Sequence, residues 1–169
     1  SCLIYHNQIF GSIEHLPVLI FPFVKLYATQ DMNIAFEMSL SFLNNYCTNW
    51  YQYYPNPPLD ILHSIFNILK HKDHQLALHL TKKCQFNVMQ VIWPLLQHYL
   101  VNQMNERQWL IFMDHILSNP SQMIQFMIVA YLITHRSSLL LIHTVKQLEH
   151  FYTSQAPFLL QTLIKLAYK

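Results

Sequence analysis

The chain has 169 residues, of which 53% are hydrophobic and only 11% are charged, and its formal net charge is +2. This length fits one domain over residues 1–169 with a sizeable core, and no linker-like stretch divides it. The basic residues never gather beyond Lys70, Lys72, Lys82 and Lys83, which excludes the dense basic stripe of a nucleic-acid binder.

The numbers of glycine and cysteine residues exclude further classes of protein. A single glycine, Gly11, excludes Gly-rich phosphate loops and dinucleotide fingerprints, so we expect no cofactor. Three cysteines without a CxxC pair are typical of a reduced, cytoplasmic protein. No apolar run reaches the roughly 18 residues of a membrane span. We therefore expect an all-α fold without a transmembrane segment.

Hydrophobic residues recur with helical spacing along the first half of the chain. Pro17 favours a helix over 17–27, and Asp31 is a good N-cap for a longer helix that extends to Trp50. The prolines of "YYPNPPLD", residues 53–60, end that helix and open the next one. Asp73 can cap a shorter helix that ends near Lys83.

The second half repeats these signals. A helix over 88–101 contains Pro94, which either starts it or kinks it. Asn105 caps the segment "ERQWLIFMDHIL", and residues 122–133 are apolar nearly all round, as a central helix should be. Two more helices are expected over 138–152 and 156–168, which gives about eight or nine helices in total.

The best candidate metal cluster is "HKDHQLALHLTKKC". Zinc prefers histidine and cysteine ligands that converge tetrahedrally. His71, His74, His79 and Cys84 have spacings that do not share one face of an α-helix, and no HExxH or CxxC motif accompanies them. The sequence therefore predicts no metal site, and zinc should be irrelevant to folding.

The other candidate residues also give little indication of a catalytic site. Asp114 and His115 are adjacent, so on a helix they point about 100° apart and form no relay. Trp50, Trp93 and Trp109 lie on apolar helical faces, where we expect core packing. The residues alone predict a helical domain with no convincing catalytic site.

Two stretches carry a family resemblance. "WPLLQHYLVNQMNERQWLIFMDHILSNP" and "VAYLITHRSSLL" resemble the late part of a TBC domain, the all-helical module of Rab GTPase-activating proteins. "LPVLIFPFVKL" and "YPNPPLDIL" are similar to a narrower WD-repeat-containing subfamily linked to centrosomes and cilia. The resemblance implies the C-terminal portion of a TBC domain. It implies protein partners, either a Rab GTPase or centrosomal or ciliary proteins, and a location at the centrosome or cilium base.

Active members of that family supply two groups to a Rab-bound GTP, an arginine from an IxxDxxR motif and a glutamine from a YxQG motif. Arg107 and Arg136 are the only arginines here, and neither follows a DxxR pattern. In an ungapped alignment anchored on Pro22, the YxQG positions fall on "SIEH", where Ser12 replaces the tyrosine, Glu14 the glutamine and His15 the glycine. A carboxylate at that position would repel phosphate, whereas an amide both donates and accepts hydrogen bonds.

The resemblance therefore implies a catalytically degenerate domain that acts as a protein-interaction scaffold, with no catalytic residue of its own. An alternative is an active Rab GTPase-activating protein whose arginine lies upstream of Ser1. A third possibility is an unrelated helical solenoid. A DxxR motif upstream of Ser1 would distinguish the second from the first.

Overall fold

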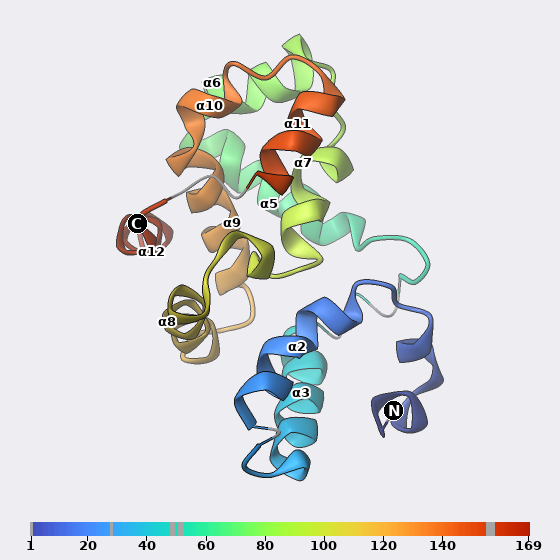
Figure 1. The fold of residues 1–169 in the computed structure, drawn as a ribbon. Coiled ribbons are helices and arrows are strands. Elements are labelled where there is room, and N and C mark those ends of the chain that lie inside the picture. Colours follow the sequence, from blue (N-terminus) through green and yellow to red (C-terminus); the bar gives the residue numbers. More distant parts are fainter. Residues whose placement is uncertain (1, 28, 48–49, 51–52, 155–157) are drawn as a thin grey trace. The chain divides into compact units, whose positions relative to one another are not determined.

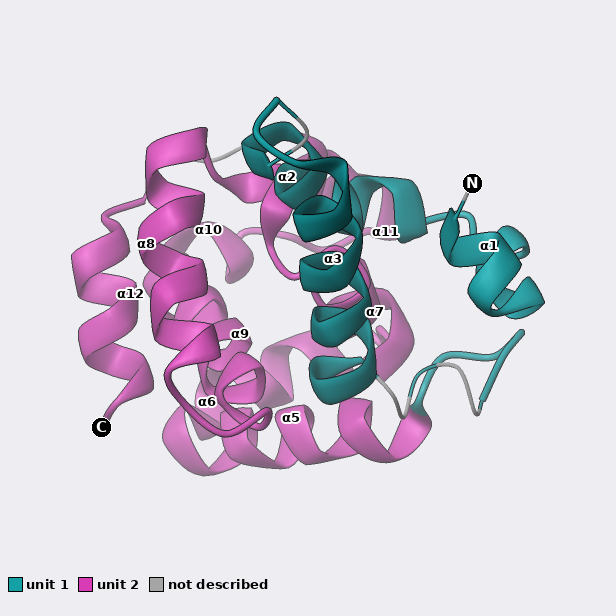
Figure 2. Cartoon of the chain, turned by 90° about the horizontal axis from the view of Figure 1, so that it is seen from below, with its two compact units in different colours: residues 1–58 teal, residues 59–169 magenta. Residues whose placement is uncertain are grey.

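A computed structural model describes residues 2–27, 29–47, 50, 53–154 and 158–169 of the chain. Every regular element within these residues is helical, which confirms the predicted all-α class. Contacts divide the chain into two compact units, residues 1–58 and residues 59–169, which carry different colours in Figure 2. The expectation of one domain over 1–169 stays a prediction. No helix in the described part of the chain is long and apolar enough to cross a membrane.

The first unit is built on a pair of packed helices. α2 begins at Leu16, one residue before the predicted start at Pro17, and Asp31 caps α3 by accepting a hydrogen bond from the Asn33 amide. The rings of Phe23 and Phe42 lie 5.1 Å apart between these helices. The elements of this unit are α1 (Cys2–His6), the 3-10 turn η1 (Gln8–Gly11), α2 (Leu16–Tyr27) and α3 (Met32–Tyr46).

The second unit surrounds one buried helix. α9 (Met123–Thr134) is apolar on every side, and eight of its twelve residues are buried, which confirms the predicted central helix. It packs against α5, α7 and α12 (Figure 1). The other elements are α5 (Leu59–Lys72), α6 (His74–Leu78), the π turn η2 (His79–Lys83), α7 (Val88–Leu96), the 3-10 turn η3 (Val101–Gln103), α8 (Glu106–Leu117), α10 (Arg136–Leu139), α11 (Val145–Thr153) and α12 (Leu160–Ala167).

Several helix boundaries differ from the sequence prediction. α7 contains Pro94 within it and ends at Leu96, because Tyr99 and Leu100 adopt left-handed backbone angles that no α-helix accommodates. The expected helix over 138–152 is interrupted at Thr144, whose extended backbone makes it the N-cap of α11. The described residues therefore contain eleven α-helices rather than eight or nine.

The end of α3 and the start of α12 also differ from the sequence prediction. α3 ends at Tyr46, before the predicted end at Trp50, and Cys47 caps it. The predicted start of the last helix at Ala156 lies outside the described residues, and α12 begins at Leu160. The predicted caps Asp73 and Asn105 are both confirmed by bonds from their side chains to backbone amides.

A buried amide links three elements of the second unit. Gln103 donates a hydrogen bond of 2.6 Å to the carbonyl oxygen of Tyr152 in α11, and it accepts one of 3.0 Å from the hydroxyl of Tyr131 in α9. The Tyr152 hydroxyl donates to the carbonyl oxygen of Val91 in α7. Burial raises the pKa of both tyrosines well above the ordinary range, so both hydroxyls remain donors.

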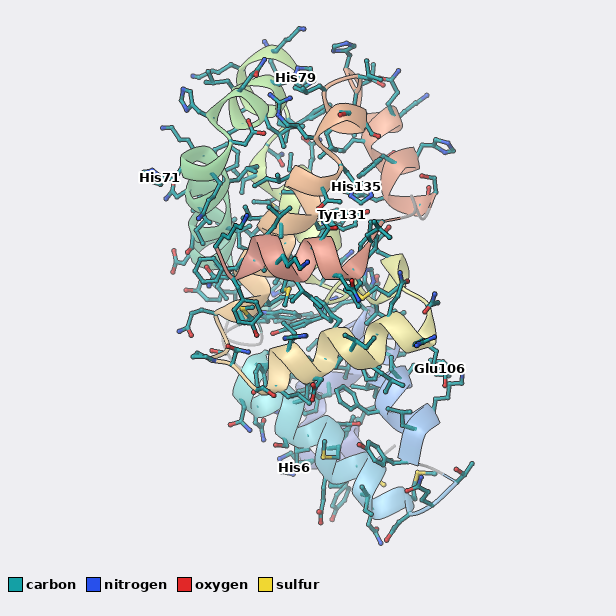
Figure 3. The ribbon with its side chains drawn as sticks, turned by 90° about the vertical axis from the view of Figure 1, so that its left-hand side faces the viewer. His6, His71, His79, Glu106, Tyr131 and His135 are labelled. Atoms are coloured by element: carbon teal, nitrogen blue, oxygen red, sulfur yellow. The ribbon has the colours of Figure 1, made fainter. Side chains whose placement is uncertain are left out.

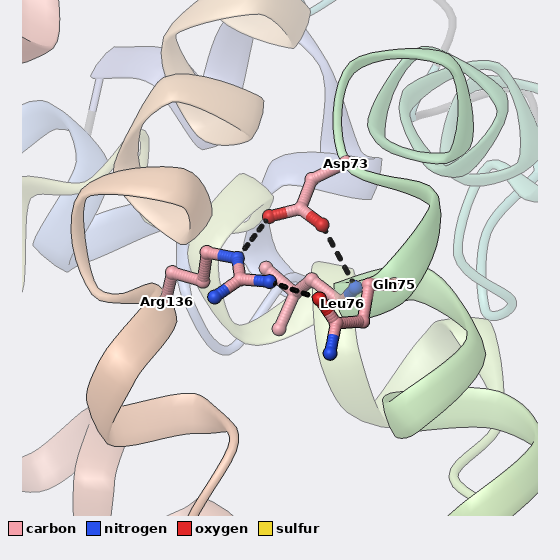
Figure 4. A network of polar contacts seen from close by, with 4 residues as sticks. All are labelled: Asp73, Gln75, Leu76 and Arg136. Carbon is pink, nitrogen blue, oxygen red and sulfur yellow. Dashed lines mark hydrogen bonds and ion pairs between the residues drawn. The ribbon is translucent and has the colours of Figure 1, made fainter.

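A second polar network fixes the start of α6. One carboxylate oxygen of Asp73 accepts the amide of Leu76 at 2.9 Å, and the other accepts the guanidinium of Arg136 at 2.7 Å (Figure 4). The same guanidinium donates to the side chain of Gln75. The cap at the N-terminus of α6 is thereby tied to α10, which lies about sixty residues further along the chain.

Candidate functional site

Ser12, Glu14 and His15, the residues that stand at the YxQG positions, form a slot in the turn that leads into α2. Ser12 and Glu14 are exposed and His15 is half-buried, while Ile13 and Leu16 are buried on either side of Glu14. The Ser12 carbonyl oxygen accepts a hydrogen bond of 3.0 Å from the hydroxyl of Tyr54, which lies 42 residues further along the chain. Ser12 is therefore tied to Tyr54, and the exposed side chain between the two buried residues is the carboxylate of Glu14.

His15 is the third residue of this slot. Its ring centroid lies 6.4 Å from that of Trp50, which is buried. The ring of His15 thus lies near the buried Trp50 of the first unit. In the turn as it stands, Glu14 can repel a phosphate or attract a cation, and it cannot donate a hydrogen bond while ionised.

The two arginines differ in their surroundings. Arg107 is exposed in the first turn of α8. Arg136 is engaged with Asp73 and Gln75, and 38% of its side chain is accessible. Extending Arg136 toward a ligand would break both contacts and would remove the link between Asp73, the cap of α6, and α10.

The remaining sequence candidates are structural in their contacts. His115 shares a hydrogen bond of 3.1 Å with the hydroxyl of Tyr168, and Asp114 is exposed. Trp109 is buried, with 5% of its surface exposed, as the sequence predicted. Trp93 is only half-buried, so the prediction that it is a core anchor is wrong.

The structure brings together two residues of the histidine-rich segment with a third that the sequence analysis did not consider. The ligand atoms of His79, Cys84 and His143 all lie within 4.8 Å of one another. The His79 Nε2 lies 3.4 Å from the Cys84 Sγ, and that sulfur lies 4.0 Å from the Nδ1 of His143. Burial raises the pKa of the Cys84 thiol, partly offset by the charge of Lys83.

The other two histidines of the segment lie outside this cluster. His71 and His74 are exposed, and Figure 3 shows His71 apart from His79. The expectation that the four sequence candidates do not converge is thus met for His71 and His74, whereas His79 and Cys84 lie within hydrogen-bonding distance. No local sequence signal points to His143, because it is 59 residues from Cys84.

The chain is similar over its whole length to proteins named TBC1 domain family member 31. It is 34% identical to the protein from Oryzias latipes over 169 residues, and 32% identical over 168 residues to those from Xenopus laevis and Homo sapiens. These alignments cover 99–100% of this chain and 15–16% of each relative, so the chain spans about a sixth of the curated relatives it matches. No family model and no solved structure matches the chain.

Proposed function

Because the chain is a relative of TBC1 domain family member 31 throughout its length, we propose that it is the C-terminal part of a TBC-like domain that binds proteins and does not accelerate GTP hydrolysis. The observation that carries the proposal is the exposed carboxylate of Glu14 in the turn before α2. By its resemblance to TBC domains, this turn takes the place of the glutamine-bearing motif. A centrosomal or ciliary location, in the cytoplasm, is part of the same proposal.

The electrostatics of phosphoryl transfer support this view. A group that positions water beside GTP has to tolerate the negative charge on the phosphates, and an ionised carboxylate repels it. Glu14 is exposed and faces water, where its ionised form is well solvated. The side chain that occupies the slot of Ser12, Glu14 and His15 thus has the wrong charge for the glutamine's role.

The arginines support it as well. An arginine that enters the active site of a GTPase is worth about 10³ to 10⁵ in rate, or roughly 4 to 7 kcal/mol of barrier. Arg136 already pairs with Asp73 at 2.7 Å, and Arg107 lies in the first turn of a helix and outside a DxxR pattern. Neither is placed like the arginine of an active family member.

A role in binding is supported by apolar side chains that remain accessible. Leu110, Ile111 and Leu117 of α8 are each about two-fifths exposed, and Leu141 and Leu159 are about three-quarters exposed. Exposed apolar surface of this kind is common where proteins meet partners. The proposed partners are a Rab GTPase or centrosomal or ciliary proteins.

The test is single-turnover GTP hydrolysis by a panel of Rab proteins in the presence of the purified chain. We expect no rate above intrinsic hydrolysis, and we expect Glu14→Gln to remain inactive because the amide alone does not supply the arginine. Glu37→Gln, an exposed change in α3 of the same unit, is the matched control. Stimulation of about a hundredfold or more on any Rab would overturn the proposal.

The active alternative is tested with the full-length protein in the same assay. If only the full-length protein stimulates hydrolysis, and the activity disappears on replacing an arginine upstream of Ser1, the domain is an enzyme and the scaffold proposal fails. Binding of GTP-loaded Rab without stimulation supports the scaffold. Imaging of the tagged full-length protein tests the location at the centrosome or cilium base.

A further inference from the structure

We propose that His79, Cys84 and His143 form a binding site for one Zn²⁺ ion, which joins the π turn η2 to the segment between α10 and α11. This inference is independent of the proposed function and reverses the sequence-based expectation that the chain has no metal site. It rests on how the backbone brings three donor atoms together.

The separations of the donor atoms suit a tetrahedral zinc ion. With zinc–sulfur bonds of about 2.3 Å and zinc–nitrogen bonds of about 2.0 Å, neighbouring sulfur and nitrogen ligands lie roughly 3.5 Å apart. The His79 Nε2 and Cys84 Sγ are already 3.4 Å apart. The Nδ1 of His143 is 4.0 Å from the same sulfur, and the three donor atoms lie within 4.8 Å of one another. A shift of the exposed His143 side chain by roughly 0.5 to 1.5 Å toward the other two therefore completes the set.

The π turn explains why residues five apart can share a ligand. In an α-helix, successive residues turn by about 100°, so His79 and Cys84 would point roughly 140° apart. In η2 the amide of Cys84 instead donates to the carbonyl oxygen of His79 at 2.9 Å, the five-residue bond of a π turn. The wider turn places the cysteine over the histidine.

The end of this turn holds Cys84 in place. Gln85 adopts a left-handed backbone angle, with φ of 56°, and the amide of Phe86 returns to the carbonyl oxygen of Leu80 at 3.0 Å. This closure stops the helix directly after Cys84. The buried side chain of Phe86 then anchors the chain beyond it.

His143 is positioned from the other side. Its amide donates to the side chain of Gln147 at 2.9 Å, and the same side chain belongs to the capping box at the start of α11. The backbone of His143 is therefore fixed by the helix that follows, while its imidazole is exposed. An ion can enter from this exposed side.

A fourth donor is present in the backbone. The carbonyl oxygen of Ile142 lies 3.0 Å from the His79 Nε2 and 3.2 Å from the Cys84 Sγ. This oxygen is placed to complete a four-ligand set, in which one sulfur and two nitrogens favour zinc over the oxygen-seeking ions magnesium and calcium. On binding, the thiol proton of Cys84 leaves to solvent as the zinc–sulfur bond forms.

The competing explanation is a cluster of hydrogen bonds. The carbonyl oxygen of Ile142 has two lone pairs, and it can accept from both the imidazole of His79 and the thiol of Cys84. That arrangement does not need His143. A dependence of metal binding on His143 therefore separates the two explanations.

The experiment is titration of the metal-free, reduced chain with Zn²⁺ by calorimetry, and with Co²⁺ by absorption spectroscopy. We expect one ion per chain, with a zinc Kd on the order of 1 μM or tighter. Bound cobalt should give a thiolate-to-metal absorption band. Zinc should also raise the unfolding temperature, because it binds the folded chain.

The variants localise the site. Cys84→Ser should abolish the thiolate band, and His143→Ala should weaken zinc binding by about tenfold or more. Since His143 is exposed, its replacement does not disturb the core, and circular dichroism verifies that the variant is folded. Cys2→Ser and His74→Asn change an exposed cysteine and an exposed histidine outside the cluster, and they should leave binding unchanged.

Three results would overturn the proposal. The first is the absence of stoichiometric binding at about 100 μM zinc, a concentration far above the expected Kd. The second is a cobalt band that persists in Cys84→Ser and disappears in Cys2→Ser. The third is equal zinc affinity in the wild type and in folded His143→Ala, which would leave only the hydrogen-bond cluster.

Discussion

Replacement of Gln103 by leucine should destabilise the second unit strongly. The side chain is 8% exposed and bonds to both Tyr131 and Tyr152. Leucine fills a similar volume but leaves a hydroxyl and a carbonyl oxygen without this partner. Each buried group that loses its partner costs about 1–3 kcal/mol, so the expected loss in the free energy of unfolding is about 2–6 kcal/mol.

Equilibrium urea unfolding, followed by circular dichroism, measures this loss. Gln161→Leu is the matched control, because Gln161 is exposed in α12, and surface changes usually stay within about 0.5 kcal/mol. Tyr131→Phe removes the hydroxyl alone and should cost about 1–3 kcal/mol. The combined Gln103→Leu and Tyr131→Phe variant should be more stable than the sum of the single losses indicates. A loss below about 0.5 kcal/mol for Gln103→Leu would refute the reasoning.

Three further predictions concern stability. Trp109→Ala should lower the free energy of unfolding by about 3–5 kcal/mol because it empties a buried site, and an unchanged melting temperature would mean that α8 is packed differently. Asp73→Ala should cost about 1–2 kcal/mol, mostly through the cap of α6, since Arg136 is partly exposed and its ion pair is screened; Arg136→Ala should therefore cost less, and the opposite order in urea unfolding would contradict this. Burial lowers the pKa of His98, so the unfolded chain protonates first as the pH falls below about 6.5, and stability falls with it. His98→Gln should reduce the loss of stability between pH 7.5 and pH 5.5, and an identical loss in both proteins would count against the argument.

Much of the fold follows from local signals. Asp31, Asp73 and Asn105 cap helices because each side chain can reach an amide two or three residues further on, which sequence spacing alone reveals. Because residues 122–133 are themselves apolar nearly all round, their burial is likewise predicted without reference to any other segment. The break at Thr144 was missed because apolar residues recur on both sides of it.

The candidate sites were harder to predict because they depend on distant contacts. Pro17 predicted the start of α2 to within one residue, so the position of the turn containing Glu14 followed from the sequence. The π turn at His79 was not, because the helical template assumes four-residue hydrogen bonds. His143 comes from a separate segment of chain, and only packing of the second unit brings it beside Cys84.

The π turn has a consequence for insertions and deletions. A five-residue hydrogen bond in place of a four-residue one amounts to one additional residue in an otherwise continuous helix. Deletion of Thr81 would restore α-helical register and place the former Cys84 four residues after His79, roughly 40° away around the helix and therefore on the same face. Relatives of this chain that lack one residue in this turn can therefore keep the histidine and the cysteine side by side without a π turn, whereas relatives with the same spacing and a regular α-helix should have lost the pairing even where both residues are retained.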